Sequence, residues 1–254
     1  MAMRLQDRVA LITGGGSGIG AAAARHMAAA GAKIAVCGIP ADGVNEVAAS
    51  LRADGFESIG LPTDVADEKQ VEAAVEKTAA KFGRLDIAVA SAAVQLHDRD
   101  HTLHELDTEA WDLTHSINFR GTMLTCKYAL QQMLPQQSGA IVIISSVTAM
   151  GGGSPNVAYL TGKHALLGLN RHIGKHYGRH GIRCNCICPG ALEKTPNHDI
   201  HPDPEGRAQQ LAESIPLGRP ATPEDIAPWV TFLSSDEARY ANGTHFLVDG
   251  GMSA

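Results

Sequence analysis

Short apolar runs alternate with longer amphipathic segments along the whole chain. The apolar runs are too short for most helices, and we predict strands at Val9–Thr13, Ile34–Cys37, Ile87–Ala90, Ile141–Ser145, Ile182–Cys188 and Phe246–Val248. The segments between them have helical periodicity, and we predict helices at Ala21–Ala30, Val44–Ala53, Glu68–Phe82, Thr108–Leu134 and Ala158–Tyr177. This alternation predicts an α/β fold, a doubly wound parallel sheet with helices on both faces.

Nothing in the chain indicates a division into separate parts. No repeat, low-complexity tract or linker-like segment interrupts it, so we expect residues 1–254 to form a single domain. A late helix start is visible where Thr222 is followed by Pro223, Glu224 and Asp225. The one irregular stretch, residues 189–216, is rich in Pro, Asp, His and Asn, and we expect it to be a substrate-binding loop.

Composition and charge narrow the range of partners. Hydrophobic residues make up 44% and charged residues 19%, which is typical of a globular protein. The net charge of −6 opposes a nucleic-acid or acidic-membrane partner and favours a small diffusing substrate. No segment has the pattern of a secretory signal or approaches the roughly 20 apolar residues of a spanning helix, so we expect a cytoplasmic protein.

The five cysteines do not indicate a metal or disulfide framework. Cys184, Cys186 and Cys188 alternate within a predicted strand, which places their side chains on one face. Side chains on one face of one strand cannot surround a tetrahedral metal. We interpret them as small buried core residues.

A glycine-rich turn from Thr13 to Gly20 joins the first predicted strand to an alanine-rich helix. Such a turn needs residues that tolerate positive φ and close backbone approach. The N–H groups and positive dipole end of the helix then favour a pyrophosphate. No Gly-Lys-[Ser/Thr] follows, which excludes the loop of nucleoside triphosphatases. The turn predicts a dinucleotide site at Gly14, Ser17, Gly18, Ile19 and Gly20.

The end of the second strand bears on the choice of cofactor. An acid that holds a ribose hydroxyl, or a base that binds a 2′-phosphate, is expected there, and the sequence has neither: Gly38 occupies the acid's usual place and Ile39 follows. Ser17 gives the turn no cation, and no Lys or Arg lies between Lys33 and Arg52. A 2′-phosphate would be poorly neutralised, so we predict NAD, with NADP as the alternative.

Tyr159 and Lys163 lie four residues apart, one turn along a predicted helix, so their side chains are neighbours. A phenol has a pKa of about 10, and a fixed cation beside it stabilises the phenolate and lowers that pKa. The pair suits acid–base chemistry. Because a Tyr and a Lys at this spacing are usually only a surface pair, the assignment depends on the surrounding motifs.

Together these motifs resemble the short-chain dehydrogenase/reductase family, and the resemblance covers essentially the whole chain. The family has a seven-stranded Rossmann-type parallel sheet with helices on both faces. The matching residues are the turn Thr13–Gly20, the adenine-contacting pair Asp64 and Val65, the helix asparagine Asn118, Ser146 thirteen residues before Tyr159, and the nicotinamide-side turn Pro189-Gly190.

The resemblance implies an NAD(P)-dependent oxidoreductase that interconverts a secondary alcohol and a ketone. Tyr159 would be the general acid/base, and Lys163 would hold the nicotinamide ribose and acidify the phenol. Ser146 would bind the substrate oxygen, and Asn118 would hold a water that links Lys163 to solvent. Further cofactor contacts are implied at Asp64, Val65, Ser91, Ala92, Pro189, Gly190 and Thr195.

Three positions depart from the family pattern. The family's N-N-A-G is here Ala90-Ser91-Ala92-Ala93, so side-chain hydrogen bonds of the asparagines are lost or replaced by Ser91. The threonine expected five residues after Pro189 is displaced by one, to Thr195. The third departure is the missing acid at Gly38.

Two histidine clusters resemble metal ligands but lack the convergent acidic or Cys partners that a metal site needs. They are His172, His176 and His180 on the helix of Tyr159, and His97, His101 and His104 after the fourth strand. We expect no metal. In the resembled family that helix packs against another subunit, which implies a homo-oligomer, a tetramer or a dimer.

We expect a small polar substrate, a polyol, sugar or hydroxy acid, bound by polar residues near the expected site mouth. These candidates are Gln95, His97, Thr148, Asn156, Glu193 and His198. Two alternatives stay open: a 3-oxoacyl-carrier-protein reductase and a catalytically silent dinucleotide-sensing protein. The first calls for basic docking residues, which are few here. The second does not need Asn118, Ser146, Tyr159 and Lys163 together.

Overall fold

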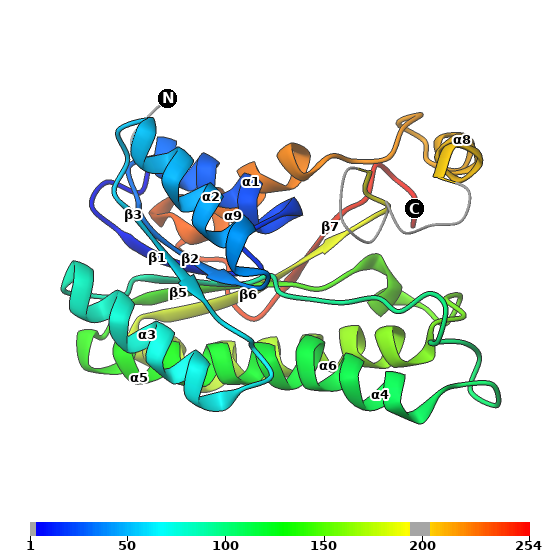
Figure 1. The fold of residues 1–254 in the computed structure, drawn as a ribbon, viewed down its shortest axis with the longest axis horizontal. Coiled ribbons are helices and arrows are strands. Elements are labelled where there is room, and N and C mark those ends of the chain that lie inside the picture. The colour runs from blue at the N-terminus through cyan, green and yellow to red at the C-terminus, as the bar shows by residue number, and fades with distance from the viewer. Residues whose placement is uncertain (1–3, 194–203) are drawn as a thin grey trace.

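The computed structural model describes residues 4–193 and 204–254, and it contains one seven-stranded sheet (Figure 1). All neighbouring strands pair in parallel, in the order β3-β2-β1-β4-β5-β6-β7. The strands are β1 (Val9–Thr13), β2 (Lys33–Gly38), β3 (Ser58–Pro62), β4 (Ile87–Ala90), β5 (Gly139–Ile144), β6 (Ile182–Pro189) and β7 (His245–Val248). This order confirms the doubly wound Rossmann-type fold.

Helices cover both faces of the sheet (Figure 1). One layer contains α1 (Gly18–Ala29), α2 (Ala41–Ala53) and α9 (Pro223–Ser234). The other contains α3 (Glu68–Phe82), α4 (Thr108–His115), α5 (Thr122–Gln136) and α6 (Val157–Tyr177). Alternate strand residues fill two separate cores, so that Leu11 packs under α3, α5 and α6 while Ile12 packs under α1, α2 and α9.

Strand β3 is missing from the sequence-based prediction. It lies at the edge of the sheet, where only Ser58 of its five residues is buried. Gly60 interrupts its apolar pattern and Pro62 ends it, as an edge strand tolerates. A half-exposed edge strand does not need the continuous apolar run that marks a buried parallel strand.

The prediction of a loop over residues 189–216 is also partly wrong, because α8 (Pro204–Ser214) lies inside it. The stretch as a whole is rich in loop-forming residues, but α8 begins with a proline at its first position and continues mainly with good helix formers. Its residues 194–203 lie outside the described residues.

The single helix predicted at Thr108–Leu134 is interrupted by one π-helical turn, Ser116–Gly121, between α4 and α5. At the end of this turn Gly121 approaches Val65 so closely that an added Cβ would lie 2.7 Å from its Cγ2. Periodicity alone does not reveal such a local widening, which in many proteins lies at a functional site.

Two smaller predictions are confirmed. Cys184, Cys186 and Cys188 are buried and unpaired, as are the other two cysteines. Helix α9 begins with a capping box in which Thr222 and Asp225 satisfy each other's backbone N–H groups. Among the described residues, no helix has the length and apolar character needed to cross a bilayer.

Candidate functional site

The glycine-rich turn between β1 and α1 forms an open cradle. Gly14 and Gly18 have φ angles of +65° and +49°, which favour glycine. A Cβ on Gly14 would lie 2.9 Å from the Ala92 backbone, and one on Gly20 would collide with the Gly14 carbonyl. The side chain of Ser17 does not cap α1, which leaves its first-turn N–H groups available for an anion. These features fit a pyrophosphate.

Thr13 joins this cradle to the segment after β4, a role that the sequence analysis missed. Its hydroxyl accepts hydrogen bonds from the backbone N–H groups of Ser91 (3.2 Å) and Ala92 (3.4 Å). It also lies 3.4 Å from the Val89 carbonyl, to which it donates. These hydrogen bonds hold the carboxyl end of β1 against the carboxyl end of β4. The strand order reverses between these two strands. Ligands of open parallel sheets bind at such a point.

The adenosine end of the predicted site lies beside β2 and β3. Gly38 has a φ of +148°, and a Cβ there would lie 3.4 Å from the Gly14 nitrogen. Ile39 is 65% exposed. Asp64 accepts a hydrogen bond from Ala66 N–H, and Val65 is buried against Gly121. Apart from the Asp64 carboxylate, these positions at the ends of β2 and β3 carry no charged group.

Ser146, Tyr159 and Lys163 meet at the carboxyl ends of β5 and β6. The Ser146 hydroxyl lies close enough to the Tyr159 phenol to lower its pKa, and it donates to the Thr148 hydroxyl at 3.1 Å. The Lys163 ammonium lies 5.4 Å from the centre of the phenol ring and donates to the Ile144 carbonyl at 2.9 Å. A phenol, a hydroxyl and a buried ammonium thus lie within reach of one substrate oxygen, an arrangement suited to proton transfer.

Burial dominates the pKa values of this pair. It lowers the pKa of the Lys163 ammonium to about 8. It raises the pKa of the Tyr159 phenol, and the Ser146 hydroxyl acts in the opposite direction. The pKa of the Tyr159 phenol therefore lies above its usual value in the free protein, because desolvation of the phenolate outweighs its stabilisation. That Lys163 acidifies the phenol stays a prediction.

Asn118 lies in the π-helical turn and is fully buried. Its side-chain amide accepts from the Val94 N–H and donates to the Val94 carbonyl, both at 2.8 Å. Its backbone carbonyl accepts from the Thr122 hydroxyl at 2.9 Å. The side chain therefore fixes the segment after β4.

The nicotinamide-side turn follows β6. Pro189 ends that strand, and Gly190 donates a backbone hydrogen bond to the Val248 carbonyl at 3.0 Å. A Cβ on Gly190 would lie 2.8 Å from the Asp249 Cα, so only glycine fits. Thr195 and His198 lie outside the described residues.

Three of the polar substrate candidates are engaged in hydrogen bonds within the protein. Gln95 donates to the Asn156 side chain at 3.2 Å, and Asn156 donates to the Asp100 carbonyl. Thr148 bonds to the Ser146 hydroxyl through both its N–H and its own hydroxyl, at 3.1 Å each. His97 and Glu193 are partly buried.

Asp100 is the other residue that the sequence analysis missed. It is fully buried, and its two carboxylate oxygens accept from the N–H groups of Ala158 and Tyr159 at 2.9 Å each. An isolated aspartate in a predicted loop gives no sequence signal for this contact, since its partners lie 58 and 59 residues away.

The histidine clusters do not assemble around a common point. Within the part of the chain that the structure describes, no group of three or more His, Cys, Asp or Glu side chains is placed to hold a metal ion. His172 and His176 stack with ring centres 4.4 Å apart on the exposed face of α6.

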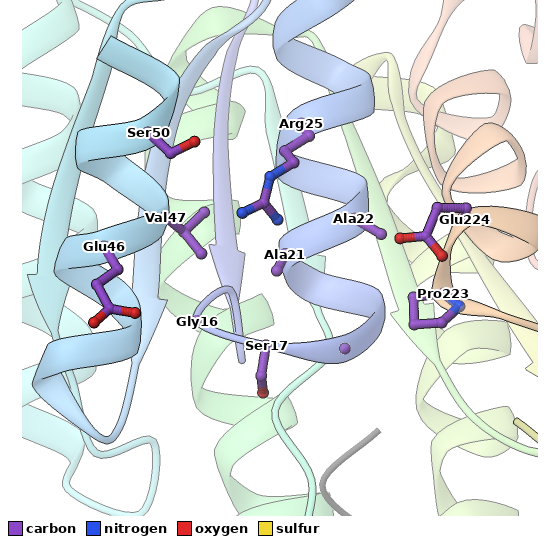
Figure 2. A pocket seen from close by; sticks show the side chains of 11 residues that line it. Gly16, Ser17, Ala21, Ala22, Arg25, Glu46, Val47, Ser50, Pro223 and Glu224 are labelled. Carbon is purple, nitrogen blue, oxygen red and sulfur yellow. The ribbon is translucent and has the colours of Figure 1, made fainter. Parts of the chain in front are cut away.

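A groove of about 430 Å³ lies behind the cradle, between α1, α2 and the start of α9. Figure 2 shows the Arg25 guanidinium between α1 and α2, while the Ser17 side chain points away from it on the other side of the turn. Glu46 and Glu224 also line this groove. The groove therefore has one cationic and two acidic side chains.

Comparison with known proteins agrees with this geometry. The family model described as enoyl-(acyl carrier protein) reductase matches residues 14–253. D-Threitol dehydrogenase of Mycolicibacterium smegmatis is 40% identical over 98% of this chain and 94% of its own length. Cis-4-hydroxycyclohexanecarboxylate dehydrogenase of Sinomonas cyclohexanicum is 39% identical, over 98% and 97%. The crystal structure of levodione reductase superposes with a TM-score of 0.93 and 36% identity, covering 98% of this chain and 99% of that one.

Proposed function

Since this chain belongs to the short-chain dehydrogenase/reductase family, we propose that it interconverts a secondary alcohol and a ketone on a small polar substrate by proton transfer at Tyr159. The chain is an NAD(P)-dependent oxidoreductase acting on CH–OH groups, which removes the alternative of a silent dinucleotide sensor. The observation that carries the proposed mechanism is the Tyr159 phenol beside the Ser146 hydroxyl, with the Lys163 ammonium 5.4 Å from the centre of its ring.

In the oxidation direction the Tyr159 oxygen takes the proton of the substrate hydroxyl, and in the reduction direction it returns that proton to the ketone oxygen. Ser146 donates a hydrogen bond to the same substrate oxygen and fixes its distance from Tyr159. The nicotinamide, when bound, supplies the hydride acceptor or donor. Lys163 would hold the ribose of the bound cofactor, and Asn118 would position a water that links Lys163 to solvent.

We assign the cofactor site to residues that line the cradle and the adjoining strand ends. The turn would bind the pyrophosphate through its backbone N–H groups, and the neighbouring segments would contact the adenosine and nicotinamide ends. The assigned residues are Gly14, Ser17, Gly18, Ile19, Gly20, Gly38, Asp64, Val65, Ser91, Ala92, Tyr159, Lys163, Pro189, Gly190 and Thr195.

We propose NAD as the preferred cofactor. The two cations that flank Gly38 in the sequence lie at the amino ends of β2 and β3, away from Gly38: Lys33 begins β2 and pairs with Glu57 at 2.8 Å, and Arg52 donates to the Ser58 carbonyl at 3.3 Å. A third, Arg25, shares its groove with two glutamates. A 2′-phosphate would therefore lose hydration without gaining a dedicated cation.

The proposed substrate class is a polyol, sugar or hydroxy acid. Support comes from the polar candidates Gln95, His97, Thr148, Asn156, Glu193 and His198, and from the names of relatives that act on threitol and on a hydroxycyclohexanecarboxylate. An acyl-carrier-protein substrate is less favoured, since Arg219 beside the Glu193 segment is paired with Asp225 at 2.7 Å.

We further propose that the protein is cytoplasmic and forms a homo-oligomer, a tetramer or a dimer. We also propose that residues 1–254 form one domain and that residues 189–216 contribute to substrate binding. Five unpaired cysteines support a reducing compartment. The sheet's edge strand β7 exposes Leu247, and α9 exposes Trp229, which supports association.

The test is Tyr159→Phe, which removes only the ionisable oxygen. We expect kcat to fall at least about 100-fold, the minimum for loss of a general acid–base. Cofactor affinity, measured by titration, should stay within about twofold. A variant that kept more than a tenth of wild-type kcat would contradict the role. Oxidation by the wild type should accelerate with rising pH as the phenol, whose pKa burial raises, ionises.

A further inference from the structure

Helix α6 carries Tyr159 in its first turn, and that turn lacks a cap of its own. Asn156 occupies the capping position but makes no side-chain capping hydrogen bond. The N–H groups of Ala158 and Tyr159 instead donate to the Asp100 carboxylate, and the Val157 N–H donates to the His101 carbonyl. All three first-turn donors are therefore satisfied by a distant segment of the chain.

The Asp100 carboxylate has no other described role. It is 0% exposed, and no described cation pairs with it. Its negative charge is balanced by the two N–H groups and the positive end of the α6 dipole. A buried carboxylate whose hydrogen bonds all go to one helix start fixes that start in place.

The segment around Asp100 is itself held firmly. Arg99 binds Asp107 and Glu109 at the start of α4, with its Nε 2.7 Å from the Asp107 carboxylate. On the other side, the Asp100 carbonyl accepts from Asn156, whose side chain also bonds Gln95. The segment thus connects the start of α4, the start of α6 and a candidate substrate contact.

We propose that Asp100 is a positioning residue for the reaction, because it holds the Tyr159 backbone so that the phenol stays in register with Ser146 and Lys163. This inference rests on the proposed function of Tyr159. Without the carboxylate two buried N–H groups lose their acceptor, the first turn of α6 loosens, and the phenol moves relative to the substrate oxygen. Misplacement of a reacting group by about 1 Å can cost on the order of 100-fold in rate.

The experiment compares Asp100→Ala and Asp100→Asn with a matched control, Asp86→Asn. Asp86 is also a buried carboxylate that accepts a backbone N–H, from Val9 at 2.9 Å, but it pairs with Arg84 and lies just before β4, at the amino end of the central strands. Steady-state kinetics at saturating cofactor are normalised to folded protein by circular dichroism, and cofactor affinity is measured by titration.

We expect kcat to fall about 10- to 100-fold in Asp100→Ala. Asp100→Asn keeps one acceptor oxygen, so its kcat should lie between that of Asp100→Ala and that of the wild type. In both, KM and cofactor affinity should stay within about twofold. Asp86→Asn should lower the melting temperature and leave kcat unchanged. This split between kcat and KM, with graded rescue by Asn, is not expected of a residue that only stabilises the fold.

Wild-type kcat in folded Asp100→Asn and Asp100→Ala would overturn the inference, as would wild-type kcat in Asp100→Asn if Asp100→Ala does not fold. The two proposals fail separately. Loss of activity in Tyr159→Phe together with normal kcat in the Asp100 variants overturns only the positioning role, whereas an active Tyr159→Phe overturns the proposed function as well.

Discussion

At the residue scale, the end of β2 determines how cofactor preference can be tested. Gly38 has a φ of +148°, a conformation that residues with a Cβ rarely adopt, so an aspartate introduced there would strain the backbone. Ile39 is 65% exposed and carries no such strain. Charge is therefore better introduced at Ile39 than at Gly38.

We predict that Ile39→Arg shifts the ratio of kcat/KM for NADP over NAD by about tenfold or more, because a guanidinium can bind a 2′-phosphate in a bidentate manner. Ile39→Gln, which has a polar side chain of similar reach without charge, is the control and should leave the ratio nearly unchanged. Both cofactors are measured with both variants and the wild type. A wild type that prefers NADP would contradict the NAD assignment.

At the element scale, α9 begins with a reciprocal cap reinforced by an ion pair. The Asp225 carboxylate accepts from the Thr222 N–H at 2.8 Å and from Arg219 at 2.7 Å. These hydrogen bonds, that of Arg219 first, lower the pKa of Asp225 to about 2. Because the pKa is lower in the folded than in the unfolded state, this stabilisation is present above about pH 4 and is lost as the pH falls toward 2.

We predict that Asp225→Ala lowers the free energy of unfolding by about 1–2 kcal/mol at neutral pH, as loss of a helix cap does. Glu224→Ala, in the same turn but outside the capping box, should cost less than about 0.5 kcal/mol. Urea denaturation at pH 7 measures both. The difference in free energy of unfolding between the wild type and Asp225→Ala should shrink below pH 4. A difference that stays the same from pH 7 to below pH 4 would contradict the role of the carboxylate.

At the scale of the whole molecule, the five buried thiols couple stability to alkaline pH. Burial raises the pKa of Cys37 and Cys126 to about 12, and it raises that of Cys184, Cys186 and Cys188 as well. In the unfolded chain the thiols ionise at about pH 9. The native state therefore binds more protons above that pH, and the stability that the neutral thiols confer is lost as the pH rises.

We predict that the free energy of unfolding falls less steeply with rising pH in Cys126→Ala than in the wild type. The two slopes should differ by about 1.4 kcal/mol per pH unit between pH 9 and 12. Urea denaturation under reducing conditions at several pH values measures the slope. Val75→Ala, a buried apolar truncation, is the control and should lower stability without changing the slope. Lys163, whose lowered pKa has the opposite effect between pH 8 and 10.5, contributes equally to all three proteins. Equal slopes in Cys126→Ala and the wild type would contradict the coupling.

Buried elements were predicted well and edge elements poorly. Strands β1 and β4 and helix α3 have the predicted bounds, because each buries a regular apolar pattern. The edge strand β3 was missed because half of it faces solvent, and α8 because loop-forming residues precede it. The apolar pattern of a segment reflects which of its residues are buried, so an element with few buried residues is difficult to predict from the sequence.

The sequence by itself determined the fold class, the phosphate-binding turn and the pairing of Tyr159 with Lys163, because these depend on local spacing and apolar periodicity. Only the tertiary structure decided that Asp100 caps α6, that Thr13 joins two strand ends and that Lys33 and Arg52 are already engaged. Hydrogen bonds and burial depend on which distant segments the sheet brings together. Pattern along the chain therefore predicted the elements, while packing between them decided which groups surround the reacting phenol.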